Sequence, residues 1–154
     1  MKNKNLVIAA VGDSSLHKQW KSGNPAFDLI LIYYGNSDLI FFDYSKDVMI
    51  CIKQNGQKFP LIKSFIETNL ELISQYDYVW LPDDDISISA DDLNRLFETA
   101  RTYSLQICQP ALISLHGDVS ASRYVPGMNW GSTPSGSIST LHSSQYAVGD
   151  PKIC

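Results

Sequence analysis

The sequence has no long hydrophobic run, few cysteines and no excess of basic residues. Its three cysteines are an odd number without C-x-x-C spacing, which supports neither a disulfide framework nor a structural zinc site. The longest apolar run near the N-terminus, residues 6–11, is too short for a membrane span or a signal-peptide core. With 12 Lys and Arg against 16 Asp and Glu, the chain lacks the basic surface of a general nucleic-acid-binding protein. We therefore expect no membrane span, no nucleic-acid partner and, by default, a reducing cytoplasmic location.

The composition is nevertheless that of a globular domain with a core. Hydrophobic residues make up 44% of the 154 residues and charged residues 18%. Short unbroken apolar runs predict strands that are buried on both faces of a sheet. These runs span residues 6–11, 27–34, 48–52 and 76–81. Residues 39–44 are interpreted in the same way, as a short edge strand.

Helical spacing of apolar residues appears in two places between these runs. One pattern, in residues 61–73, follows Pro60, which suits a first helical turn. The other follows Ser89, which with Asp92 resembles a capping box. Strands that alternate with helices predict an α/β fold: a mostly parallel, Rossmann-like sheet in a three-layer α/β/α arrangement.

The end of the chain has a different composition. Of the 29 residues from Pro126 onward, 15 are Ser, Thr, Gly or Pro, and only Asp150 and Lys152 are charged. Neither helical nor strand periodicity continues there, which predicts a flexible or loosely packed tail. We therefore divide the chain into a folded part, residues 1–125, and a tail, residues 126–154. An apolar segment interrupted by Pro110, residues 105–115, ends the strand-forming region.

Three consecutive acids, Asp83, Asp84 and Asp85, follow the last predicted strand. Between Asp77 and Glu98 there are seven acids and one base, so local cations do not neutralise the triplet. Like charges a few ångströms apart repel by about 1 kcal/mol per pair even in water, so solvent, raised pKa values or a divalent cation must offset the repulsion. Ligands of parallel sheets bind at the carboxyl ends of the strands. A metal site and a solvated acidic turn before the next helix both remain open.

Part of the chain resembles a known family of bacterial and plant proteins predicted to be glycosyltransferases. The resemblance rests on YDYVWLPDDDISISADDLNRLF (residues 76–97) and LQICQPALIS (residues 105–114). These contain the family's two hallmarks, a strand ending in W-x-P-D-D-D and, after a helix, a Q-P-A-L segment. NGQKFPLIKSFIE (residues 55–67) is similar to the family's lead into the preceding helix. The resemblance covers roughly residues 6–114 and implies a GT-A type fold.

The resemblance implies roles for particular residues. Asp83 and Asp85 match the D-x-D carboxylates that bind Mn²⁺ or Mg²⁺ and often the donor's ribose, with Asp84 between them. Gly12 and Asp13, at the exit of the first strand, would lie under the nucleobase, although an ordinary strand-ending turn is equally compatible with them.

Lys58 would neutralise a diphosphate, and a solvated loop lysine is the alternative. The aromatic residues Tyr33, Tyr34 and Trp80 would stack on a base or sugar, or belong to the core.

The function that the resemblance implies is binding of a UDP- or GDP-linked sugar through a divalent cation, with transfer to an unknown acceptor. GT-A domains of this kind continue well beyond the Q-P-A-L segment, and the last 29 residues here resemble nothing in that half. We therefore expect a truncated homologue that retains the donor half, lacks a recognisable catalytic base and self-associates through a cut edge. A non-catalytic nucleotide- or metal-binding remnant and a metal-dependent phosphohydrolase are the alternatives.

Overall fold

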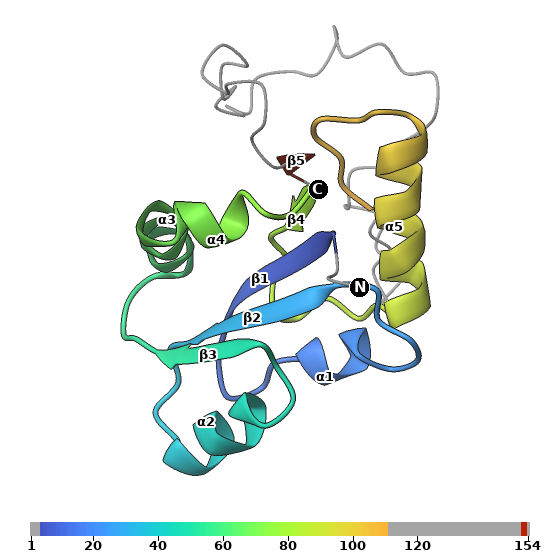
Figure 1. Ribbon diagram of the computed structural model, residues 1–154. Coiled ribbons are helices and arrows are strands. Elements are labelled where there is room, and N and C mark those ends of the chain that lie inside the picture. The colour runs from blue at the N-terminus through green and yellow to red at the C-terminus, as the bar shows by residue number, and fades with distance from the viewer. Residues whose placement is uncertain (1–3, 111–151, 154) are drawn as a thin grey trace, which may run out of the picture. The chain divides into compact units, whose positions relative to one another are not determined.

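The computed structural model describes residues 4–110 and 152–153 (Figure 1). Nearly all of them belong to one compact unit, Met1–Cys108 with Gly149–Cys154, which carries every element below. A second unit, Gln109–Val148, is described only at its first two residues. In chain order the elements are β1 (Asn5–Val11), α1 (His17–Trp20), β2 (Asp28–Tyr33), α2 (Asp38–Ser45), β3 (Ile50–Lys53), α3 (Lys58–Thr68), α4 (Leu70–Ile73), β4 (Tyr78–Trp80), α5 (Ala90–Thr102) and β5 (Lys152–Ile153).

The strands form one parallel sheet in the order β3-β2-β1-β4-β5. This confirms the predicted α/β fold with a Rossmann-like sheet. Val11 at the end of β1 pairs with Tyr33 at the end of β2, and Tyr33 pairs with Lys53 of β3. The carboxyl ends of these three strands are therefore level, and the segments that follow them emerge at one edge of the sheet.

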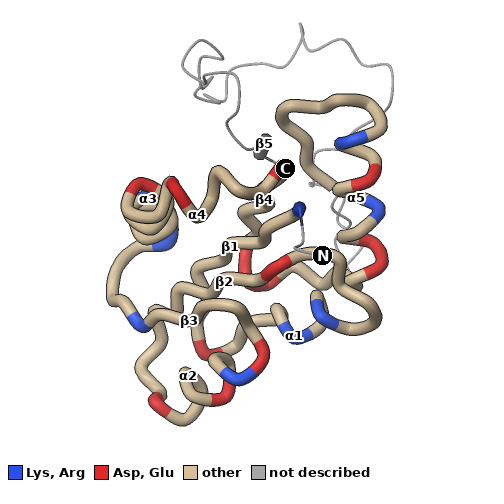
Figure 2. The backbone as a smooth tube through the Cα atoms, in the orientation of Figure 1, with Lys and Arg blue, Asp and Glu red and all other residues tan. Residues whose placement is uncertain are grey.

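Helices cover both faces of this sheet, as the predicted three-layer arrangement requires (Figure 1). Every residue of β1 is buried, and alternate side chains enter two separate hydrophobic clusters. One cluster joins the sheet to α1, α2 and α5, and the other joins it to α3 and α4. Because β1 is buried on both faces, its sequence after Asn5 is continuously apolar. Charged residues lie on the helices and connections around it (Figure 2).

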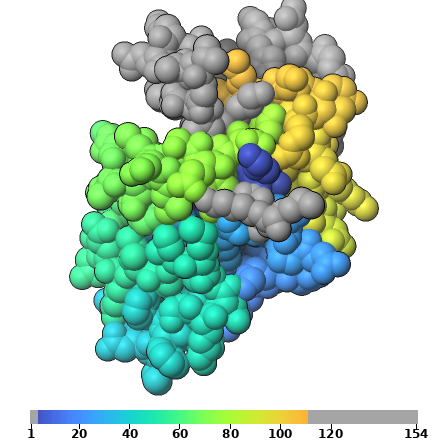
Figure 3. Space-filling view, in the orientation of Figure 1, coloured from blue at the N-terminus to red at the C-terminus, as the bar shows by residue number. Residues whose placement is uncertain are grey.

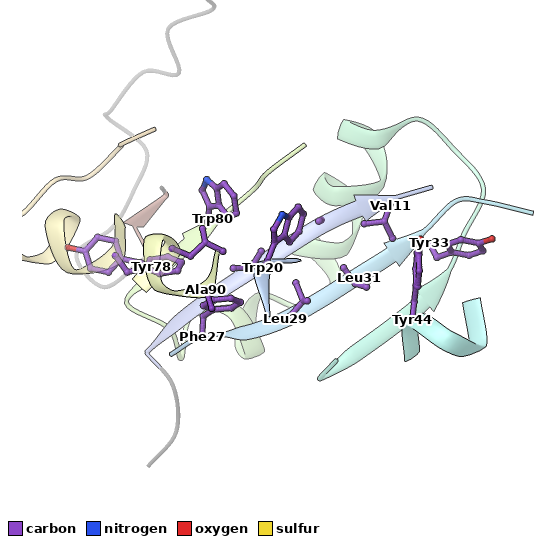
Figure 4. Close-up of a cluster of buried hydrophobic side chains, with 14 of the residues drawn as sticks. Val11, Trp20, Phe27, Leu29, Leu31, Tyr33, Tyr44, Tyr78, Trp80 and Ala90 are labelled. Atoms are coloured by element: carbon purple, nitrogen blue, oxygen red, sulfur yellow. The ribbon is translucent and has the colours of Figure 1, made fainter. Parts of the chain in front are cut away.

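The first cluster contains a tryptophan pair that the sequence patterns did not connect. Trp20, the last residue of α1, is fully buried and packs edge-on against Trp80 of β4 at 5.7 Å between ring centroids (Figure 4). Its indole Nε1 donates a hydrogen bond to the Ile86 carbonyl at 2.7 Å. Trp20 thus ties the β1–β2 crossover to the segment between β4 and α5. The short helix α1 itself was not predicted.

The predicted edge strand at residues 39–44 is wrong, because those residues lie in α2. Ser37 has an extended backbone and its side chain accepts the Ile40 amide at 3.3 Å, which caps the helix. Parallel strands β2 and β3 also need a crossover between them, and α2 supplies it. The apolar run resembled a strand because α2 is apolar on several sides: Leu39 and Phe42 are 85% and 65% exposed.

The other two predicted helices are confirmed, with adjusted bounds. The first begins at Lys58, so Pro60 lies within its first turn, where a missing amide costs no intrahelical hydrogen bond. It is interrupted at Asn69, which divides the predicted helix into α3 and α4. The second, α5, is capped by Ser89, whose side chain accepts the Asp92 amide at 3.2 Å as predicted. Both α2 (cyan) and α3 (teal to green) are visible in the view of Figure 3, although they cover opposite faces of the sheet.

Several predictions concern residues that the structure does not describe. The tail beyond residue 125 is described only at β5, where Lys152 and Ile153 pair with Tyr78 and Val79 of β4. The second half of the Q-P-A-L segment, residues 111–112, and the end of the apolar segment at residues 105–115 also lie outside the described residues. Within residues 4–110 and 152–153, no helix is long and apolar enough to cross a membrane.

Candidate functional site

The candidate site lies where the direction of the strand order changes. From β1 the chain proceeds to β2 and β3 on one side, and then returns to β4 on the other side of β1. The segments after β1 and β4 therefore diverge at the carboxyl edge, and such a divergence is the usual ligand site of open parallel sheets. Gly12 and Asp13 follow β1, and the three aspartates follow β4. The sequence predicted both segments as candidate site residues.

Asp84 connects these two segments. Its Oδ2 accepts a hydrogen bond from the buried Gly12 amide at 2.9 Å and another from the Tyr34 hydroxyl at 3.3 Å. The Asp84 carbonyl also accepts the Leu16 amide at 2.7 Å. Burial, together with the Asp84 carboxylate, raises the pKa of the Tyr34 hydroxyl. Asp84 is therefore directed toward β1, while Asp83 and Asp85 on either side of it are exposed.

Asp13 is held by β2 and the start of α2. The Tyr33 hydroxyl donates to Asp13 Oδ1 and accepts the Ser37 amide at 2.9 Å. Gly35 passes so close that an added Cβ would lie 2.2 Å from Asp13 Oδ1, so no larger residue fits there without movement. Burial first, and then the hydrogen bond to Asp13, raises the pKa of Tyr33. The carboxylate of Asp13 is thus fixed on the α2 side of the site.

Lys58 reaches the triplet from the opposite side. It is the first residue of α3, and its ammonium group forms an ion pair with Asp83 Oδ1. The Lys58 side chain is 20% exposed, whereas that of Asp83 is 64% exposed. Burial lowers the pKa of Lys58, and the carboxylates of Asp84 and Asp85 oppose this effect. The structure therefore brings Lys58 to the acidic triplet, although 24 residues of sequence separate it from Asp83.

An open hollow of about 350 Å³ adjoins Asp13. Apolar side chains of α2 form part of its wall, and polar groups from the β1–α1 segment, α1 and α2 form the rest. Its lining residues are Asp13, Ser15, Lys18, Leu39, Ile40, Asp43 and Tyr44. The hollow therefore combines apolar side chains with the carboxylate that Tyr33 holds.

The triplet has the donor set of a weak cation site only. Among the described residues, no group of three His, Cys, Asp or Glu side chains is arranged to hold a metal ion. Asp83 and Asp85 together supply two exposed carboxylates, and Mg²⁺ often binds through one or two carboxylates with water and phosphate as its other ligands. The residues therefore fit a cation that arrives with a phosphate ligand.

Sequence reasoning did not identify the groups that position the carboxylates. Tyr33 is fully buried in one core cluster and Tyr34 packs against the other, as the core alternative predicted. What the sequence did not indicate is that their hydroxyls also hold Asp13 and Asp84. Neighbouring residues in extended backbone project to opposite faces, and this alternation at the end of β2 is a signal for that division. Trp80 is 3% exposed and belongs to the core.

A model of one protein family matches residues 1–129, and its description is "Protein of unknown function (DUF707)". The chain belongs to this family. The match includes every candidate residue named above. No curated protein and no solved structure matches the chain. The DUF707 description names no activity, so the function must be argued from the site.

Proposed function

We propose that this chain binds a UDP- or GDP-linked sugar together with Mn²⁺ or Mg²⁺, and that Asp83 and Asp85 hold the cation. The observation that carries the proposal is the Asp84 carboxylate, which holds the acidic loop after β4 against Gly12 at the end of β1. This contact holds the acidic triplet beside Asp13, and Lys58 reaches the triplet from α3, at the edge of the sheet where ligands of parallel sheets bind.

The two sides of the site suit the two ends of a nucleoside diphosphate. On the α2 side, Asp13 can accept a hydrogen bond from a base N–H, and the neighbouring hollow has an apolar wall. On the α3 side, Lys58 and the amide groups of the helix N-terminus favour phosphate oxygens. A divalent cation bound there would stabilise the charge on a departing diphosphate. Asp84 keeps the loop in place between the two sides.

The arrangement favours this function over a metal-dependent phosphohydrolase. Such an enzyme would use Asp13 as nucleophile, with the lysine and the metal acids gathered around the same phosphoryl group. Here Asp13 is held on the α2 side by Tyr33, whereas Lys58 pairs with Asp83 on the α3 side. Burial lowers the pKa of Lys58, and the carboxylates that oppose this effect are those of Asp84 and Asp85 rather than that of Asp13.

Calorimetric titration tests the proposal. UDP and GDP are titrated with and without Mn²⁺ into the wild type and into the Asp83→Asn and Asp85→Asn variants. In the wild type we expect metal and one nucleotide each to raise the affinity for the other. Either substitution should reduce that gain by about tenfold or more, which corresponds to ~1.4 kcal/mol.

Asp77→Asn is the matched control, because Asp77 is an aspartate just before β4, whereas Asp83 lies just after it. Its only ion pair in the described structure is an exposed one with Lys4 at 3.8 Å, and its replacement should leave nucleotide and metal binding unchanged. The proposal is wrong if metal and nucleotide bind independently in the wild type, or if neither binds. Phosphate release from a simple phosphomonoester, lost in Asp13→Asn, would instead support the phosphohydrolase.

A further inference from the structure

The position of Lys58 is unfavourable for the helix that carries it. The N-terminus of α3 has the positive end of the helix dipole, where acidic residues stabilise and basic residues destabilise. The first turn of α3 contains no acid, and the N-cap residue Gln57 makes no side-chain capping hydrogen bond. Lys58 therefore adds a positive charge at the end of the helix where the dipole is already positive. The stability of α3 does not explain it.

Burial of the Lys58 side chain carries a second free-energy cost for the fold. Its side chain is 20% exposed, so much of a charged group is removed from water. The ammonium also lies 5.7 Å from the centre of the Phe59 ring. Its ionic partner, Asp83, is 64% exposed and lies on the loop after β4. A half-buried cation is thus held against an accessible anion that a competing cation from solvent can reach.

We propose that Lys58 occupies the cation position at Asp83 until a diphosphate draws its ammonium group away. This inference rests on the proposed function. In the free protein the ammonium neutralises Asp83 and competes with a divalent cation for the same carboxylate. When a diphosphate binds at the start of α3, Lys58 pairs with a phosphate oxygen, and Asp83 becomes available to the metal. Diphosphate and metal therefore enter together, and neither binds tightly alone.

Manganese titration followed by electron paramagnetic resonance of free Mn²⁺ tests this exchange. The protein is titrated alone and with inorganic pyrophosphate, as wild type and as Lys58→Gln and Lys58→Met. Both variants should bind Mn²⁺ alone about three- to tenfold more tightly than the wild type, because the competing cation is gone. Pyrophosphate should raise the Mn²⁺ affinity of the wild type at least threefold more than that of either variant.

Lys63→Gln is the matched control on the same helix. Lys63 is 75% exposed and pairs with Glu67 at 3.5 Å rather than with the triplet. The Lys63→Gln variant should therefore bind Mn²⁺ with the affinity of the wild type. Removing a positive charge from the start of α3 should not destabilise the helix, and circular dichroism will show that the Lys58 variants are folded. Since the two variants differ in polarity, a change shared by both reports the lost charge.

The outcomes separate this inference from the proposed function. If the Lys58 variants bind Mn²⁺ alone no more tightly than the wild type, or keep its full response to pyrophosphate, the exchange is wrong. Cooperative binding of Mn²⁺ and UDP or GDP to the wild type would then leave the proposed function intact. If the exchange occurs with pyrophosphate but no nucleotide binds, the nucleotide assignment fails and the metal–diphosphate site stands. If the wild type binds no Mn²⁺ under any condition, both are wrong.

Discussion

Replacement of Asp84 should destabilise the fold, although Asp84 lies in an acidic loop. Its carboxylate is the acceptor for the buried Gly12 amide at 2.9 Å and for the Tyr34 hydroxyl at 3.3 Å. Asp84→Ala leaves the amide without that partner, and a lost hydrogen bond to a charged group costs ~1.5–3 kcal/mol. Relief of repulsion from Asp85 returns up to about 1 kcal/mol, and Asp83 adds little because Lys58 already neutralises it. We expect a net loss of about 1–2 kcal/mol and a fall in Tm of roughly 3–8 °C.

Urea unfolding, followed by tryptophan fluorescence and by circular dichroism, measures this difference. Asp84→Asn retains an oxygen that can accept the Gly12 amide, so it should recover more than half of the loss. Asp85→Ala is the control, because Asp85 is exposed in the same loop, and its free energy of unfolding should stay within about 0.5 kcal/mol of the wild type. If Asp84→Ala is as stable as Asp85→Ala, Asp84 does not hold the loop on β1.

Three further substitutions test the surroundings of the site. Burial, and then Lys18, lower the pKa of His17 from 6.5 to about 4. The free energy of unfolding should therefore fall by at most about 3 kcal/mol as the pH drops from 6.5 to 4. In urea titrations, His17→Gln should weaken this pH dependence. Gly35→Ala places a methyl group against Asp13 and should lower Tm by several degrees in calorimetry. Trp20→Phe removes a buried hydrogen bond and ring volume, and chemical unfolding should show a loss of ~1–3 kcal/mol.

Strands β1 to β4 were predictable because burial leaves a simple mark in the sequence, whereas β5 lies in the tail, where the sequence shows no strand periodicity. β1 is buried at every position, and its residues after Asn5 are apolar without alternation. The start of α5 was predictable for a local reason, the Ser89 cap. By contrast, α1 has four residues and its stability depends on tertiary contacts of Trp20, which local periodicity does not report. The error at α2 has the same origin, since its apolar residues are partly exposed and do not mark one face.

For the site, sequence predicted where the acids lie along the chain but not which way each one faces. Gly12, Asp13 and the aspartate triplet were identified, and the structure brings both segments to one edge of the sheet. The D-x-D spacing singles out the first and third aspartates and says nothing of the middle one. Its direction depends on the Gly12 amide just after β1 and the Tyr34 hydroxyl just after β2, which are 72 and 50 residues away in the chain. Contacts between residues so far apart in the chain can be recognised only when the strand order is known.

The structure also changes the physical argument for a metal at the triplet. From the sequence, three adjacent acids had no nearby cation, and a divalent ion was one way to offset their repulsion. In the fold, Asp84 is stabilised by an amide and a hydroxyl, and Asp83 by a lysine from another helix. Charge repulsion therefore no longer requires a metal. A metal ion is favoured for a different reason: the charge of Asp83 is balanced by Lys58, which a phosphate can attract. The loop can therefore exchange one cation for another without ever carrying three uncompensated charges.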